Sequence, residues 1–136
     1  HRTSRRQRQM CIRDRNKMLL NIVMVGLGGA LGAVSRFFTN EIFSIYFPDS
    51  SWIATLTVNV IGCFFIGLAL GSFVSNKDIY FYFFIIGFLG SFTTMSAFTH
   101  QVILISNSNI IFAVSYIMLT IFLTILATYI GVSFTK

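Results

Sequence analysis

Charged residues are scarce in this sequence. Of its 136 residues only 10% are Asp, Glu, Lys or Arg, and only four are acidic. Soluble domains carry about 25% charged residues, so this chain has too few polar side chains to cover a soluble globule. With 55% hydrophobic residues and a mean hydropathy of +0.78, it also differs from disordered proteins, which are poor in apolar residues and rich in charge. The composition therefore predicts an integral membrane protein.

Catalytic and metal-ligating patterns are missing as well. The two cysteines, Cys11 and Cys63, lack the spacing of metal ligands and predict neither a disulfide framework nor a metal site. The sequence contains no recognisable carboxylate pair, Ser-His-Asp set or phosphate-binding glycine loop. It therefore predicts that the protein is not an enzyme.

The positive charge is confined to one end of the chain. Seven of the ten Lys and Arg residues lie within the first seventeen positions, where Asp14 is the one acid, so this stretch carries the whole net charge of +6. A short basic tail does not indicate a nucleic-acid-binding surface, and no nucleic-acid partner is expected. Residues 1–17 are interpreted as a non-native or disordered leader before a true start at Met18. The alternative is a cytoplasmic arm that contacts anionic headgroups.

Residues 18–136 contain four apolar segments, each with about the 20 residues that a helix needs to cross roughly 30 Å of hydrocarbon. These segments are Leu19–Phe38, Trp52–Val74, Ile79–Ile105 and Ile110–Phe134. The expected connections are Thr39–Ser51, Ser75–Asp78 and Ser106–Asn109. We therefore expect one all-α domain of four transmembrane helices in the plasma membrane or a bacterial inner membrane. Apart from the tail, Lys and Arg show almost no asymmetry between the two sides, so the domain could insert either way.

Polar residues persist inside membrane helices only where protein or a water-filled path receives them. In the second segment, Asn59 either serves a functional site or makes an interhelical hydrogen bond that only holds helices together. The hydroxyls of the fourth segment either bond back to their own helix or face a path that needs donors, and their regular spacing favours the path. These residues, spaced by four, are Tyr116, Thr120, Thr124 and Thr128.

Glycine and hydroxyl residues interrupt the centre of the third segment. Its central stretch, residues 87–96, reads GFLGSFTTMS. Neighbouring Thr and Gly favour local unwinding, which frees backbone carbonyl and N–H groups. Broken helices near the membrane midplane are where ion sites are built. The third helix is therefore predicted to be broken near the midplane.

Three motifs, in order along the chain, resemble those of the CrcB/Fluc fluoride channels. Residues 28–36 read GGALGAVSR and resemble the family pattern GGxxGAxxR. Residues 55–62 read TLTVNVIG and resemble TLxVNxxG, while residues 87–98 read GFLGSFTTMSAF and resemble GxxGGxTTFSTF. The resemblance covers residues 18–136. In the first motif, Gly28 and Gly32 are four apart and predict a strip of small residues where another helix can approach closely.

The resemblance implies a passive fluoride channel built as an antiparallel, dual-topology dimer, with two pores and a structural sodium ion at the centre of the interface. The implied partners are fluoride, membrane lipid and either a second copy or a paralogue. The implied sodium ligands are the backbone carbonyls of Gly90 and Thr93. The implied fluoride-pore residues are Thr55, Asn59, Thr94, Met95, Ser96, Phe98, Tyr116, Thr120, Thr124 and Thr128. Such uncharged donors suit fluoride, because a fixed charge would bind the ion too tightly to release it.

The sequence departs from the family pattern at several positions, and three of them bear on the site. Met95 stands where the first of two pore phenylalanines is expected, Ser91 replaces a glycine, and Gln101 replaces an acidic residue. Because Met95 offers a thioether in place of a ring edge, we expect a homodimer with altered conduction or one half of a heterodimer, and a non-conducting subunit is the alternative. A small four-helix multidrug exporter is less expected, since its proton coupling needs a membrane-embedded carboxylate and the four acids are expected in the tail and connections.

Overall fold

The computed structural model describes residues 2–48, 50–72 and 78–135, with side chains described within 15–48, 50–70 and 78–135. The elements in chain order are α1 (Arg2–Tyr46), α2 (Ser51–Ser72), η1 (Phe81–Leu89), α3 (Gly90–Phe92), α4 (Met95–Ser108) and α5 (Ile110–Ser133). Four stretches are long and apolar enough to cross a membrane: Arg15–Tyr46, Ser51–Leu70, Phe81–Ser108 and Ile110–Ser133. The prediction of a helical chain with four such spans is confirmed.

The first predicted connection, Thr39–Ser51, begins too early. α1 continues to Tyr46, so Thr39 and Glu41 lie in its last turns. The Thr39 hydroxyl donates to the Ser35 carbonyl at 2.9 Å, within the helix. Helical hydrogen bonding is blocked only at Pro48, which has no N–H and disfavours helical backbone in the residue before it. At its other end α1 begins at Arg2, so the backbone of the basic stretch is helical.

The connection predicted at Ser106–Asn109 shrinks to Asn109 alone, because this residue ends one helix and begins the next. Its backbone is extended, and its N–H donates to the Ile105 carbonyl at 2.8 Å, which ends α4. Its side-chain oxygen accepts the Phe112 N–H at 3.0 Å, which caps the start of α5. The connection predicted at Ser75–Asp78 lies outside the described residues except for Asp78.

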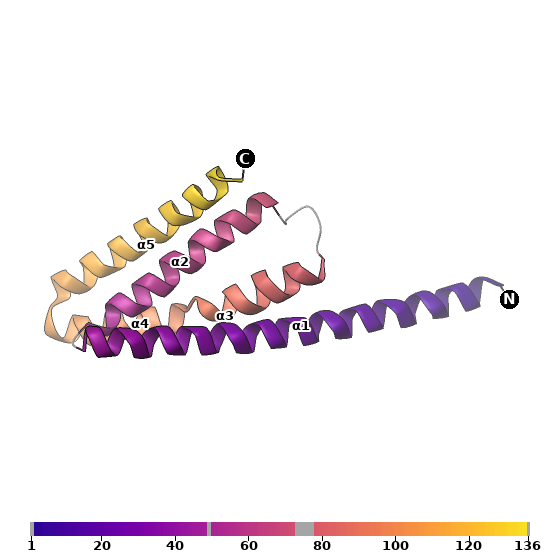
Figure 1. Ribbon diagram of the computed structural model, residues 1–136, viewed down its shortest axis with the longest axis horizontal. Coiled ribbons are helices and arrows are strands. Elements are labelled where there is room, and N and C mark those ends of the chain that lie inside the picture. Colours follow the sequence, from indigo (N-terminus) through magenta and orange to yellow (C-terminus); the bar gives the residue numbers. More distant parts are fainter. Residues whose placement is uncertain (1, 49, 73–77, 136) are drawn as a thin grey trace.

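The spans pack as two pairs whose members are alternate spans in the sequence (Figure 1). α1 lies along η1 and α3, and α2 lies along α5. Since each span reverses the direction of the chain, the members of each pair run parallel. α4 packs against α5 and α2. The N-terminal end of α1 extends beyond the other helices in Figure 1.

Glycines allow close backbone approach within both pairs. A Cβ atom on Gly28 of α1 would collide with the Phe83 carbonyl oxygen of η1, and a Cβ on Gly32 would collide with the Phe88 carbonyl oxygen. The predicted strip of small residues is therefore confirmed as a packing surface. In the other pair, a Cβ on Gly67 or Gly131 would likewise collide with a backbone carbonyl of the opposite helix. This second contact was not predicted from the sequence.

The buried core between α4 and α5 positions the functional site. Phe98 and Ile105 of α4 are buried against Ala113 and Tyr116 of α5, and Trp52 of α2 packs against this cluster. Much of the remaining surface is apolar, with many large hydrophobic side chains exposed. Such a surface suits a protein that has lipid around it.

Candidate functional site

The third span loses its helical backbone at two consecutive residues. α3 ends at Phe92, and Thr93 is extended with φ −73° and ψ 151°. Thr94 is also extended, with φ −148° and ψ 118°, and its hydroxyl oxygen accepts the Ala97 N–H at 3.2 Å as the N-cap of α4. The helical hydrogen-bonding pattern therefore stops and restarts within the stretch Phe81–Ser108. We call Thr93 and Thr94 the interruption.

Asn59 of α2 binds the backbone of this interruption through both ends of its amide. Its Oδ1 accepts the Thr94 N–H at 2.8 Å, and its Nδ2 donates to the Thr94 carbonyl at 3.1 Å. The Asn59 side chain is buried, so these bonds satisfy polar groups that lie away from water. An amide nitrogen carries two hydrogens, and one of them remains for another acceptor.

A cavity of about 280 Å³ lies beside the interruption, between α2, α4 and α5; we call it the polar cavity. It is lined by Asn59, Cys63, Thr93, Thr94, Met95, Phe98, Thr120, Ile121 and Thr124. Six predicted pore residues therefore meet at one place, together with Thr93 of the predicted sodium pair. Cys63 and Ile121 were not predicted as lining residues. The available signal for Cys63 was its position one helical turn after Asn59.

The other four predicted pore residues do not line the polar cavity. Thr55 is buried in α2, one turn before Asn59, and Ser96 is exposed with its hydroxyl 3.2 Å from that of Thr94. Thr128 lies one turn beyond Thr124 and donates to carbonyls at 3.0 and 3.3 Å. Tyr116 is the fourth of these residues.

Tyr116 is 1% exposed, and its ring centroid lies 5.4 Å from that of Phe98. Its ring also makes an edge contact with Trp52, with a centroid separation of 5.7 Å. Its hydroxyl has no hydrogen-bond partner among the described residues. A buried hydroxyl without a partner costs about 1–3 kcal/mol, so this group is available to a ligand or a water molecule.

The threonines of α5 donate to their own helix. Thr120 donates to the Tyr116 carbonyl and Thr124 to the Thr120 carbonyl, both at 2.8 Å. Because a hydroxyl has one hydrogen, each presents only acceptor lone pairs to the cavity in this conformation. The expectation that the row offers donors is therefore not met here, although Thr120 and Thr124 do line the polar cavity.

The carbonyls of Gly90 and Thr93 are among those that lose their helical donors at the interruption. In a continuous helix the Thr94 N–H would bond the Gly90 carbonyl, and the Ala97 N–H would bond the Thr93 carbonyl. Instead, the Asn59 side chain accepts the first N–H and the Thr94 hydroxyl accepts the second. Unwound carbonyls of this kind can coordinate a sodium ion, so the backbone oxygens of Gly90 and Thr93 fit such a site.

Side chains were the other possible source of cation ligands in the part of the chain that the structure describes. Within the parts of the chain that the structure describes, His, Cys, Asp and Glu residues form no group of three or more that could hold a metal ion. A cation bound near the interruption would therefore depend on the backbone oxygens.

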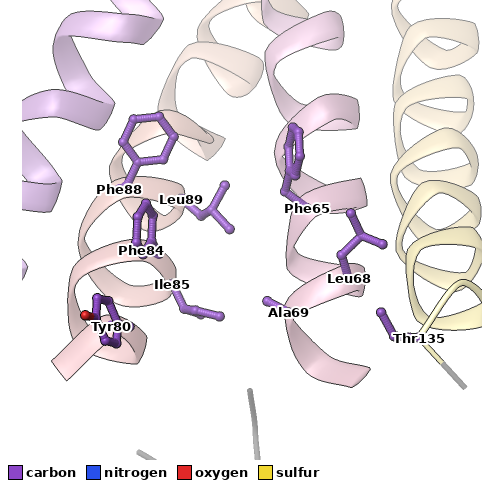
Figure 2. A pocket seen from close by; sticks show the side chains of 9 residues that line it. All are labelled: Phe65, Leu68, Ala69, Tyr80, Phe84, Ile85, Phe88, Leu89 and Thr135. Atoms are coloured by element: carbon purple, nitrogen blue, oxygen red, sulfur yellow. The ribbon is translucent and has the colours of Figure 1, made fainter. Parts of the chain in front are cut away.

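A larger cavity, of about 570 Å³, is lined by side chains of α2, of Tyr80 and η1, and of Thr135 (Figure 2). It is lined by Phe65, Leu68, Ala69, Tyr80, Phe84, Ile85, Phe88, Leu89 and Thr135. Among the described residues of this lining, only Tyr80 and Thr135 carry polar side chains. A small anion would find few donors there, so the polar cavity is the candidate site.

Comparison with known proteins finds similar proteins over most of the chain. Residues 23–132 match the model of a family described as CrcB-like protein, Camphor Resistance (CrcB). A Campylobacter jejuni protein named fluoride-specific ion channel FluC is 39% identical over 118 residues, which cover 84% of this chain and 96% of that relative. A protein of the same name from Campylobacter fetus is 41% identical over 115 residues, which cover 81% of this chain and 89% of that relative. Another, from Gloeothece citriformis, is 31% identical over 121 residues, which cover 87% of this chain and 98% of that relative. The part that matches the family model contains every residue that lines the polar cavity.

Proposed function

The chain belongs to the CrcB-like protein family, as its three motifs predicted, and on this premise we propose that it is a passive channel that exports fluoride from the cytoplasm. Its four membrane-spanning helices make it a multi-pass membrane protein, which we place in the plasma membrane or a bacterial inner membrane. The observation that carries the proposal is the polar cavity, whose lining, as far as the chain is described, contains no charged side chain.

The chemistry of this lining suits a small, strongly hydrated anion. A pore has to replace the water of such an ion with hydrogen-bond donors, but a fixed positive charge would hold the ion too tightly to release it. Asn59 supplies an uncharged donor through its second amide hydrogen. Phe98 supplies a ring whose edge is the positive part of its quadrupole.

Thr120 and Thr124 would join this donor set by rotation of their hydroxyl groups. Each would give up one hydrogen bond to its own helix, which is worth about 0.5–1.5 kcal/mol. The hydroxyl would gain a charge-assisted bond to the anion, which is stronger than a neutral one. Fluoride itself would therefore turn these hydroxyls from helix-bonded groups into pore donors.

We further propose an antiparallel, dual-topology dimer with two pores and a central structural sodium ion. Gly90 is exposed, so its uncommitted carbonyl is accessible to another protein chain. An inverted second copy would double the set of two carbonyl oxygens that one chain offers to a cation. Met95, 70% exposed although it lines the polar cavity, would be covered by the partner. That partner is a second copy or a paralogue that supplies the missing aromatic ring.

Fluoride efflux from proteoliposomes tests the function. Vesicles loaded with potassium fluoride receive valinomycin, so that potassium leaves with the anion, and a fluoride electrode records the release. We expect release well above that of protein-free vesicles without ATP or a proton gradient. A folded, reconstituted protein that gives no such release would contradict the channel proposal. It would favour the alternative of a non-conducting subunit, which is motivated by the methionine at position 95 in place of an aromatic ring.

A further inference from the structure

The hydrogen bonds around Thr94 determine which backbone carbonyls are free. The Thr94 N–H could bond either the Gly90 carbonyl, which would continue the helix, or the Asn59 side chain. It bonds Asn59, at 2.8 Å. The preceding N–H, that of Thr93, still follows the helical pattern and bonds the Leu89 carbonyl at 3.1 Å. The helical pattern is therefore abandoned at the first residue that Asn59 contacts.

We propose that Asn59 is a positioning residue for the cation site. By accepting the Thr94 N–H, it leaves the Gly90 carbonyl free to coordinate the ion. The Thr94 hydroxyl does the same for the Thr93 carbonyl by accepting the Ala97 N–H. This inference rests on the sodium site of the proposed function, and it assigns to Asn59 a second task besides facing fluoride.

The two hydrogen bonds of Asn59 help it to compete with the Gly90 carbonyl for the Thr94 N–H. The amide acts as a peptide group would, because it accepts from the Thr94 N–H and donates to the Thr94 carbonyl. Both bonds are buried, so water is not available to replace the side chain if it is lost. A Thr94 N–H without Asn59 would return to its helical acceptor, the Gly90 carbonyl, and the cation would lose that ligand.

Asn59 therefore couples the two ion sites. Its side chain lines the polar cavity and at the same time sets the backbone of the proposed sodium ligands. Mutations of the groups that orient metal ligands commonly lower metal affinity by about 10–100-fold. We expect a loss of sodium affinity in this range when the acceptor of Asn59 is removed.

The test is the sodium dependence of the melting temperature of the full chain, with potassium replacing sodium at constant ionic strength. The variant Asn59→Leu keeps the approximate size of the side chain and removes both hydrogen bonds. It should raise the half-saturating sodium concentration by about 10–100-fold. The control is Val58→Ala, because Val58 is fully buried and next in sequence. It should lower the melting temperature in both salts and leave the half-saturating concentration unchanged.

A second pair of variants keeps the test decisive if Asn59→Leu does not fold. Thr94→Ser retains the hydroxyl that accepts the Ala97 N–H, whereas Thr94→Val removes it at nearly constant shape. We expect the sodium response to survive in the serine variant and to weaken in the valine variant. Equal responses in these two variants would argue against the positioning role.

Three results separate this inference from the proposed channel function. An unchanged half-saturating sodium concentration in Asn59→Leu would overturn the inference, as would the lack of any sodium-specific stabilisation of the wild type. Fluoride efflux is measured separately on the wild type. If efflux is absent while sodium stabilises the wild type and Asn59→Leu loses that response, the channel proposal fails and the positioning role stands.

Discussion

The packing of α1 against η1 gives a prediction in which the same substitution has different effects on stability at two nearby glycines. A Cβ atom added to Gly28 would collide with the Phe83 carbonyl oxygen and lie 3.0 Å from the Phe88 backbone nitrogen. These obstacles are backbone atoms, which cannot turn aside as a long side chain can. A Cβ added to Gly26, two residues earlier in the same helix, would have nothing within 4 Å.

The magnitude follows from two effects. Replacing glycine by alanine inside a helix stabilises it by about 1 kcal/mol, and this gain applies to both positions. Gly28→Ala also forces the two helices apart, and overpacking of this kind costs about 1–3 kcal/mol. Gly26→Ala should therefore be stabilising, whereas the free energy of unfolding of Gly28→Ala should be lower than that of Gly26→Ala by about 1–3 kcal/mol.

The single tryptophan provides the assay, because Trp52 packs edge-on against Phe112 and Tyr116 and its fluorescence reports loss of this packing. Thermal or denaturant unfolding of both variants in the same detergent gives the difference in stability. Equal stabilities of Gly28→Ala and Gly26→Ala would refute the close contact between α1 and η1. The comparison needs no assumption about fluoride.

Three further predictions concern the site. Met95→Phe should raise the rate of fluoride efflux about threefold to tenfold, since aromatic edge contacts contribute about 0.5–1.5 kcal/mol; an unchanged rate would show that this position does not face the ion. Tyr116→Phe should leave the melting temperature unchanged or raise it, because the hydroxyl has no partner in the described chain, but should slow efflux in a fluoride-electrode assay. Thr124→Val should slow efflux while Thr124→Ser retains it, and similar rates for the two would exclude the hydroxyl as a donor.

The sequence predicted the spans well because hydrocarbon imposes a strong and simple requirement on length and polarity. The end of the first span is predicted too early because polar residues such as Thr39 mark a boundary of hydropathy but not of the helix. The helix in fact tolerates them, since the Thr39 hydroxyl bonds back to the helix, and it ends just before Pro48. Hydropathy locates the apolar part of a helix, whereas backbone hydrogen bonding determines where the helix ends.

The residues of the site were predictable as types but not in their hydrogen bonding. The spacing of the α5 threonines does place Thr120 and Thr124 at the polar cavity. Whether their hydroxyls donate to the cavity or to the helix depends on rotation about single bonds, which spacing does not determine. The two alternatives for Asn59 were left open for the same reason. The structure shows that its amide bonds the Thr94 backbone and also lines the cavity, so the two roles are compatible.

The central claim is that fluoride crosses the membrane passively through an uncharged, donor-lined path. The most direct measurement is the reversal potential of the current that the reconstituted protein carries across a planar bilayer with different fluoride concentrations on the two sides. We expect this potential to follow the fluoride gradient and to be unaffected by an imposed chloride or pH gradient. A potential that follows the chloride or proton gradient, or a folded protein that carries no current, would contradict it.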